Sequence, residues 1–116
     1  MKPSALFIIT GDPRTSAKPA EAIRIAAGVG TWKKADIRVY LRGPAVLALS
    51  EYVDEFIDED NFSRYFPIVA EFGRPIYVQR GAELLNEIGD SPLKFEEIDD
   101  AQLAQLAARA HYVLRF

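Results

Sequence analysis

The sequence contains no cysteine among its 116 residues. This absence excludes disulfides, thiolate nucleophiles, persulfide carriers, cysteine–zinc sites and cysteine-ligated iron–sulfur clusters. Histidine is nearly absent as well, since His111 is the only one, and neither a P-loop nor a Gly-x-Ser-x-Gly nucleophile elbow occurs. We therefore expect no cofactor and no metal site, and the lack of a catalytic motif favours a protein that is not an enzyme.

An excess of basic charge and a long apolar run are also missing. The formal net charge is -3 and the pI is about 5.1, whereas a nucleic-acid or anionic-membrane partner favours a basic surface. No apolar run approaches the roughly 20 residues that span a bilayer, and residues 5–10 are too short for the apolar region of a signal peptide. These absences predict a cytoplasmic protein without nucleic-acid or membrane partners.

Short apolar segments alternate with segments of helical spacing along the chain. Apolar runs that end at glycine, proline or charged residues predict buried strands at 5–9, 37–41, 75–78 and 111–116, with a weaker edge strand at 94–98. Strands separated by helices favour a mostly parallel sheet with helices on both faces. The sequence therefore predicts one domain, residues 1–116, with a flavodoxin-like three-layer α/β/α sandwich of about five strands.

The helices between these strands are predicted from apolar spacing and from glycine, proline and cap residues. One begins near Pro19 and ends at Gly28 and Gly30, where C-cap glycines are expected. A second is predicted over 46–57, with acidic residues on its solvent face. The remaining predicted helices are one capped by Ser63 with Pro67 in its first turn, a short one at 82–88, and one capped by Asp99 or Asp100.

Ligands of doubly wound folds sit beyond the carboxyl ends of the strands. The candidate ligand-binding residues at those ends are Gly11, Asp12, Arg14, Arg42, Gly43, Gln79, Arg80 and Gly81. Guanidinium groups and backbone N–H groups at helix starts suit a phosphate, sulfate or carboxylate. Asp12 would orient one arginine or accept a ligand hydroxyl. The alternative is that these arginines are solvated or pair with acids.

Other features have plain structural interpretations. Gly28 and Gly30 lie at a helix end rather than between a strand and a helix, so they do not make a dinucleotide fingerprint. The acids of 51–60 are interpreted as a solvent face. His111 as a base for a serine nucleophile stays an unsupported alternative. The aromatic residues Trp32, Tyr52, Phe62, Tyr65 and Phe66 are either core residues or part of a subunit interface.

Four segments, in order, are similar to the DsrE family of sulfur-relay proteins. They are residues 6–12, 39–46, 76–82 and 110–116, and in this order they extend over nearly the whole chain. The resemblance implies a DsrE-like fold and assembly into a homo-oligomer, a trimer or hexamer. It also implies a reactive cysteine just after the third strand. In this sequence Gln79 or a near neighbour stands there, and a glutamine amide is not a nucleophile, so only the location of the site carries over.

These considerations support three hypotheses. The first is a cysteine-less DsrE-like protein that is a non-catalytic, oligomeric subunit and binds a small anion or a partner protein. The second is an accessory subunit of a sulfur-relay complex whose cysteine comes from another chain. The third is an enzyme of non-covalent chemistry in which Asp12, Arg14, Gln79 and Arg80 position a substrate.

Overall fold

The computed structural model describes residues 3–32 and 35–116. In this part of the chain five parallel strands form one sheet in the order β4-β3-β2-β1-β5. The strands are β1 (Ser4–Ile9), β2 (Asp36–Leu41), β3 (Ile76–Gln79), β4 (Phe95–Ile98) and β5 (Tyr112–Arg115). The predicted parallel α/β fold is confirmed, and β4 lies at an edge as expected. The interior strand β1, which lies between β2 and β5, is buried along almost its whole length, which is why its sequence is continuously apolar.

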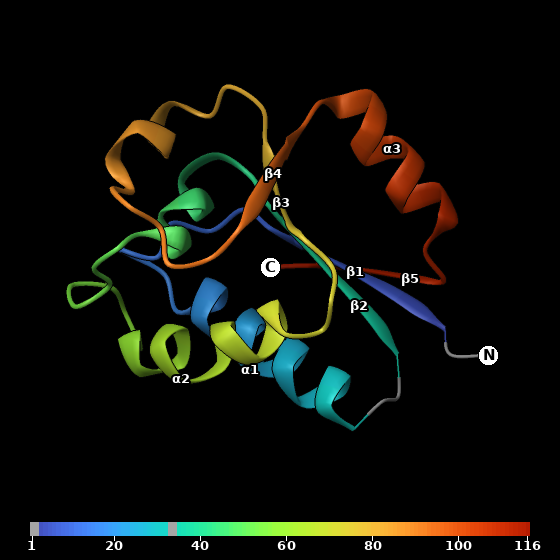
Figure 1. Cartoon of the computed structure of the whole chain (residues 1–116), viewed down its shortest axis with the longest axis horizontal. Coiled ribbons are helices and arrows are strands. Elements are labelled where there is room, and N and C mark those ends of the chain that lie inside the picture. The colour runs from blue at the N-terminus through green and yellow to red at the C-terminus, as the bar shows by residue number, and fades with distance from the viewer. Residues whose placement is uncertain (1–2, 33–34) are drawn as a thin grey trace.

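Helices cover the two faces of the sheet unequally (Figure 1). The helices α1 (Lys18–Thr31) and α2 (Glu59–Ala70) pack on one face, and α3 (Asp100–Arg109) packs on the other. Right-handed crossovers explain this division. The connections from β1 to β4 all step in one direction, whereas the connection from β4 to β5 returns past β1 and places α3 on the opposite face.

The larger core lies between the sheet and the α1–α2 face. It includes Phe7, Val39 and Val78 from the strands and Ile23 and Phe66 from the helices. The core under α3 is smaller and contains Leu6, Ile8, Tyr40 and Ile98. None of the α3 side chains is fully buried, so this face of the sheet is covered only in part.

The helix predicted over 46–57 is wrong in most of its length. The chain forms a short 3₁₀ helix, η1 (Gly43–Leu49), and no helix covers residues 50–58. All five residues from Ala45 to Leu49 are buried, so this segment has no solvent face of the kind that an amphipathic α-helix presents. Asp58 then adopts a positive φ of 55°, which separates the segment from α2.

The boundaries of three other helices also differ from the prediction. The helix α2 begins at Glu59 rather than after Ser63, so Pro67 lies inside it instead of in its first turn. Gly28 and Gly30 lie within α1, whose C-cap is Trp32 in a right-handed conformation, so neither is a C-cap glycine. The short helix predicted at 82–88 is a 3₁₀ helix, η2 (Glu83–Glu87). The cap predicted at Asp99 or Asp100 is Asp99, which forms a capping box with Gln102.

The predicted aromatic group divides between core and surface. Phe62 and Phe66 are buried in the larger core and Tyr65 packs against it in part. Trp32 and Tyr52, by contrast, are 76% and 75% exposed. Among the described residues, no helix is long and apolar enough to cross a membrane.

Candidate functional site

The loop after β1 carries a closed ion pair between Asp12 and Arg14. Arg14 donates from Nη2 to Asp12 Oδ2 at 2.8 Å and from Nε to Oδ1 at 3.0 Å, and its backbone N–H donates to Oδ1 at 2.9 Å. These hydrogen bonds from Arg14 hold the pKa of Asp12 below its usual value, although partial burial acts in the opposite direction. The pair occupies both carboxylate oxygens, so Asp12 is held as an ionised partner of Arg14.

The arginines after β2 and β3 both reach toward the first turn of α3. Arg42 Nη1 donates to Asp100 Oδ1 at 2.9 Å and to the hydroxyl of Tyr40 at 3.0 Å. The hydrogen bond to Asp100, then that to Tyr40, raises the pKa of Arg42 above its ordinary value. Arg80 Nη1 lies 3.7 Å from Asp99 Oδ2. The two arginines therefore bind the α3 terminus to the carboxyl edge of the sheet.

Gln79 connects the ends of β3 and β2. Its Oε1 accepts a hydrogen bond from the Gly43 backbone N–H at 2.9 Å. Gly43 has a φ of 58°, a left-handed conformation that a residue with a Cβ adopts only under strain. Gln79 thus stabilises the turn that leads into η1. At the location where the resemblance places a cysteine, this chain has a neutral side chain with a structural hydrogen bond.

The structure therefore brings Gln79 and Gly43 into contact and pairs each of the three candidate arginines with an aspartate. Gly81 lies in the turn after β3 with a φ of 74°, and its N–H donates to Glu97 Oε1 at 3.3 Å. Gly11 contacts the start of α1, because a Cβ there would lie 3.1 Å from Pro19 Cδ. The five pockets found in residues 3–32 and 35–116 are lined by none of the eight candidate ligand-binding residues. Anion binding at this edge stays a prediction, and an anion there would have to displace existing ion pairs.

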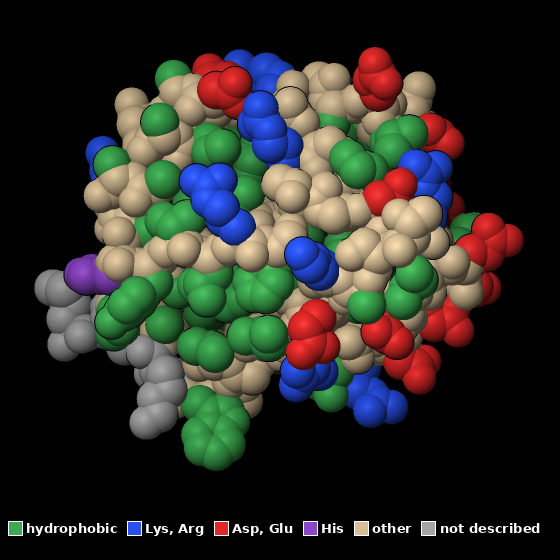
Figure 2. Space-filling model, turned by 180° about the vertical axis from the view of Figure 1, so that it is seen from behind, with side chains coloured by type: hydrophobic (Ala, Val, Ile, Leu, Met, Phe, Trp, Pro, Cys, Tyr) green, Lys and Arg blue, Asp and Glu red, His purple; other side chains and the backbone are tan. Residues whose placement is uncertain are grey.

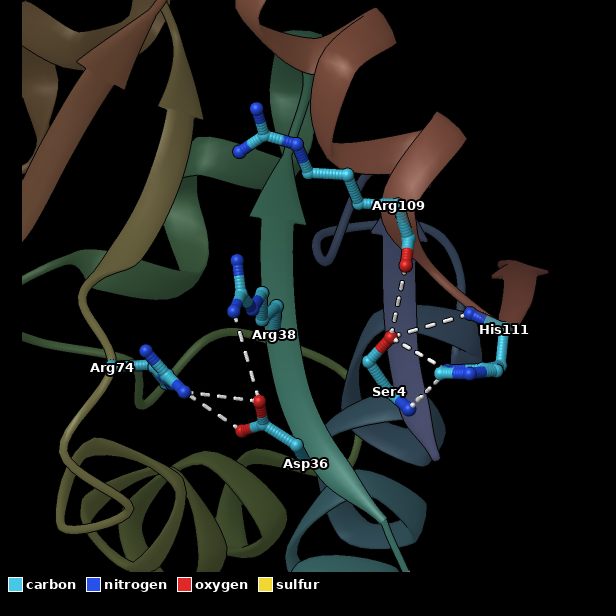
Figure 3. A network of polar contacts seen from close by, with 6 residues as sticks. All are labelled: Ser4, Asp36, Arg38, Arg74, Arg109 and His111. Carbon is cyan, nitrogen blue, oxygen red and sulfur yellow. Dashed lines mark hydrogen bonds and ion pairs between the residues drawn. The ribbon is translucent and has the colours of Figure 1, made fainter. Parts of the chain in front are cut away.

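The opposite, amino-terminal edge holds a polar network that we did not predict (Figure 3). The Ser4 backbone N–H donates to His111 Nδ1 at 3.0 Å, and the His111 backbone N–H donates to Ser4 Oγ at 3.2 Å. Ser4 Oγ in turn donates to the Arg109 carbonyl oxygen at 3.3 Å. These bonds tie the start of β1 to the link between α3 and β5.

The contact between Ser4 Oγ and His111 Nδ1, at 3.2 Å, does not make a nucleophile–base pair. The single lone pair on Nδ1 already accepts from the Ser4 backbone, so the neutral ring carries its proton on Nε2. The structure shows no carboxylate among the described hydrogen bonds of His111 that would orient the ring. The arrangement is a set of structural hydrogen bonds that joins the start of β1 to the segment before β5.

Three arginines and one aspartate lie beside the hydrogen bonds between Ser4 and His111. Asp36 accepts from Arg74 Nη2 at 3.1 Å and Arg74 Nε at 3.3 Å, while Arg38 Nη2 stays 3.7 Å away. Arg38 and Arg109 line a cavity of about 100 Å³ under the end of α3. One signal for it was present in the sequence: Arg38 is a charged residue in the middle of an apolar strand, on the same face as Tyr40.

A third feature is an apolar surface along β5. Its residues surround an open hollow of about 600 Å³ between β5 and α1. We define the β5 surface as Ile25, Val29, Ala35, Tyr112 and Leu114. Figure 2 shows hydrophobic side chains gathered beside His111 on this side of the molecule. Trp32, the C-cap residue of α1, follows Val29 by three residues and is exposed.

Comparisons with known proteins identify the fold. No family model and no curated protein sequence matches the chain. Its structure is similar to that of the YchN protein from E. coli, with a TM-score of 0.77 and 22% sequence identity over the full length of both chains. This level of identity shows the fold and carries no statement about activity. The chain therefore has a DsrE-like α/β fold, built on a five-stranded parallel sheet.

Proposed function

We propose that this chain is a non-catalytic subunit that assembles with copies of itself through the edge of β5. The observation that carries the proposal is the exposed apolar edge strand. Tyr112 is 61% exposed and Val113 is 39% exposed, although both belong to a strand of the sheet. Exposed apolar side chains along an edge strand, beside the apolar β5 surface, are typical of protein–protein contacts.

The backbone of β5 supplies hydrogen-bonding groups for a partner strand. His111 donates its N–H inward, to the Ser4 carbonyl oxygen at 3.0 Å. Because successive residues of a strand direct their backbone groups to alternate sides, Tyr112 and Leu114 direct theirs to the free edge. Their side chains lie on the α1 face, where the side chains of a strand paired with this edge would lie beside them.

The two edges of the sheet differ in how they are protected. Exposed acidic residues, Glu96 and Glu97, occupy the middle of β4, and charges at an edge oppose pairing with another strand. The middle of β5 carries Val113 and Leu114 instead. The contrast supports β5, rather than β4, as the edge that is covered by another chain.

A second copy of the same strand fits this edge. A two-fold axis through Val113 places Tyr112 opposite Leu114 of the second copy, and the reverse, in an antiparallel hydrogen-bonded pair. The contact is then isologous, with the same surface on both chains. Such pairs give assemblies with an even number of chains, so the predicted hexamer is compatible with three of them, whereas a trimer requires a different contact.

The absence of cysteine supports a non-catalytic role in this assembly, since no thiolate is available to carry sulfur. None of the candidate arginines at the carboxyl edge is left free to bind a ligand, because Arg14, Arg42 and Arg80 all have aspartate partners. The proposal therefore rests on the β5 surface and not on the carboxyl edge.

Native mass spectrometry of the full chain tests the proposal. We expect dimers or larger even-numbered assemblies for the unchanged protein. Tyr112→Lys places a charge in the contact, and we expect the dissociation constant to rise at least about tenfold. Tyr52→Lys is the matched control, because Tyr52 is similarly exposed but lies outside the β5 surface, and it is expected to leave assembly unchanged.

A monomer at high micromolar concentration would overturn the proposal, as would a Tyr112→Lys variant that assembles like the unchanged protein. Circular dichroism spectra of both variants check that each chain remains folded. If the chain instead assembles only when a cysteine-bearing relative is present, self-association is contradicted and the accessory-subunit hypothesis is favoured.

A further inference from the structure

We propose that Arg38 and Arg109 bind a small oxyanion of the phosphate or sulfate class in the cavity under the carboxyl end of α3. The site lies at the amino-terminal edge of the sheet, opposite the carboxyl edge where ligands of this fold class were expected. It is independent of the assembly through β5.

The cavity itself is lined by two guanidinium groups and by no acidic side chain. It has a volume of about 100 Å³, and its lining residues are Ser4, Ala5, Leu6, Arg38, Leu106, Arg109 and Ala110. A space of this order accommodates a few water molecules or one small oxyanion. It is too small for a nucleotide, because ligand pockets for such molecules begin at roughly 300 Å³.

Arg38, which lines this cavity, also has a buried hydrogen-bond donor without a partner in residues 3–32 and 35–116. Its Nε is buried and has no partner among the described residues. Buried donors in folded proteins are nearly always paired, and an exception has a cause such as local strain or a bound water or ion. The nearby Asp36 does not satisfy it, since its carboxylate is engaged by Arg74 and lies 3.7 Å from Arg38 Nη2.

Arg109 supplies the second cationic group. Its backbone is held in place by the Ser4 hydroxyl, and no hydrogen bond or ion pair of its guanidinium is found in the described part of the chain. A cation in the last turn also interacts favourably with the helix dipole, but that interaction does not require a second arginine across the cavity. In Figure 3 the side chains of Arg109 and Arg38 extend along the same face of β2.

The local balance of charge favours an anion. The cluster contains Arg38, Arg74 and Arg109 against the single carboxylate of Asp36. Guanidinium groups donate two parallel hydrogen bonds to the oxygens of a phosphate or sulfate. An oxyanion in the cavity would accept hydrogen bonds from these guanidinium groups and neutralise part of the excess positive charge.

Isothermal titration calorimetry with inorganic phosphate, and separately with sulfate, tests the inference on the full chain. Sodium chloride at equal ionic strength controls for general screening. We expect saturable binding of one anion per chain. Arg109→Gln should weaken that binding at least about tenfold, because a hydrogen bond to a charged group is lost. Arg64→Gln is the matched control, since Arg64 is an exposed arginine of α2 on the other face of the sheet.

Arg38→Met separates binding from a purely structural role. If Arg38 serves the anion, this variant loses phosphate binding but keeps or raises its melting temperature without phosphate, because an unpaired buried donor has been removed. A lower melting temperature with unchanged phosphate affinity would overturn the inference. So would an absence of saturable binding, equal weakening by Arg64→Gln, or binding that chloride reproduces.

Discussion

Individual residues at the carboxyl edge show why charge alone does not define a binding site. Arg14, Arg42 and Arg80 were expected to surround an anion, and in the structure each contacts an aspartate. Asp12, which was expected to orient an arginine or to accept a ligand hydroxyl, is paired with Arg14. The partners of Arg42 and Arg80 are Asp100 and Asp99, which are distant in sequence and become neighbours only because α3 begins at this edge.

The Asp12–Arg14 pair predicts a specific acid sensitivity. The folded-state pKa of Asp12 is lowered by its hydrogen bonds with Arg14, so the pair contributes stability above the unfolded pKa of about 3.9. That contribution is lost as the pH falls through the lowered folded-state pKa. Urea unfolding between pH 7 and pH 2 should therefore show that the stability difference between the unchanged protein and Arg14→Gln disappears at the acid end. A difference that is constant over this range would contradict the assignment, and Arg64→Gln is the control.

Among the secondary-structure elements, α1 contains two glycines with opposite environments. A Cβ at Gly28 would meet no atom within 4 Å, whereas a Cβ at Gly30 would lie 2.1 Å from Cε2 of Phe72. The close approach lets the ring of Phe72, just after the end of α2, pack directly against α1. It also shows that Gly30 is required by packing and not by a cap.

Alanine substitutions in α1 should therefore have opposite effects. Gly28→Ala is expected to stabilise the protein by about 0.5–1 kcal/mol, because alanine restricts the unfolded chain and favours the helix. Gly30→Ala is expected to destabilise it by about 1–3 kcal/mol through overpacking against Phe72. Denaturant unfolding of the two variants measures both values. Stabilisation by Gly30→Ala would show that the Phe72 ring moves aside without cost.

Other elements show where sequence pattern sufficed and where it did not. The strands were located well because a strand buried on both faces is continuously apolar, as in residues 5–9. The helix over 46–57 was wrong because only its first residues are helical, in η1, where they are all buried. Its later apolar residues lie outside any helix, and helical spacing alone does not distinguish this arrangement from an amphipathic face. The start of α2 was missed because Asp58 enters it with a positive φ and without a side-chain cap.

At the scale of the whole molecule, the unequal covering of the sheet produces both proposed sites. The single helix α3 leaves the cavity at Arg38 and Arg109 on its face. The position of β5 at the end of the sheet leaves an unpaired apolar edge. Both features follow from the one connection that reverses direction, between β4 and β5.

Assembly through β5 makes stability depend on concentration. A contact made only by folded chains stabilises them by mass action, so the melting temperature of the unchanged protein should rise as chain concentration increases. Differential scanning calorimetry over a hundredfold range of concentration measures this dependence. Tyr112→Lys should remove it and Tyr52→Lys should preserve it. A melting temperature that is independent of concentration for the unchanged protein would count against the contact.

The sequence by itself determined the α/β class, the parallel sheet, the location of the strands and the exclusion of thiol chemistry. These follow from local patterns and from composition, which a single chain displays directly. Only the tertiary structure decided that the candidate arginines are paired, that Gln79 holds the Gly43 turn, and that Arg38 and Arg109 face one cavity. The physical reason is that ion pairs, close approaches and free edges depend on which distant segments become neighbours, and in this molecule the order of the strands sets those neighbours.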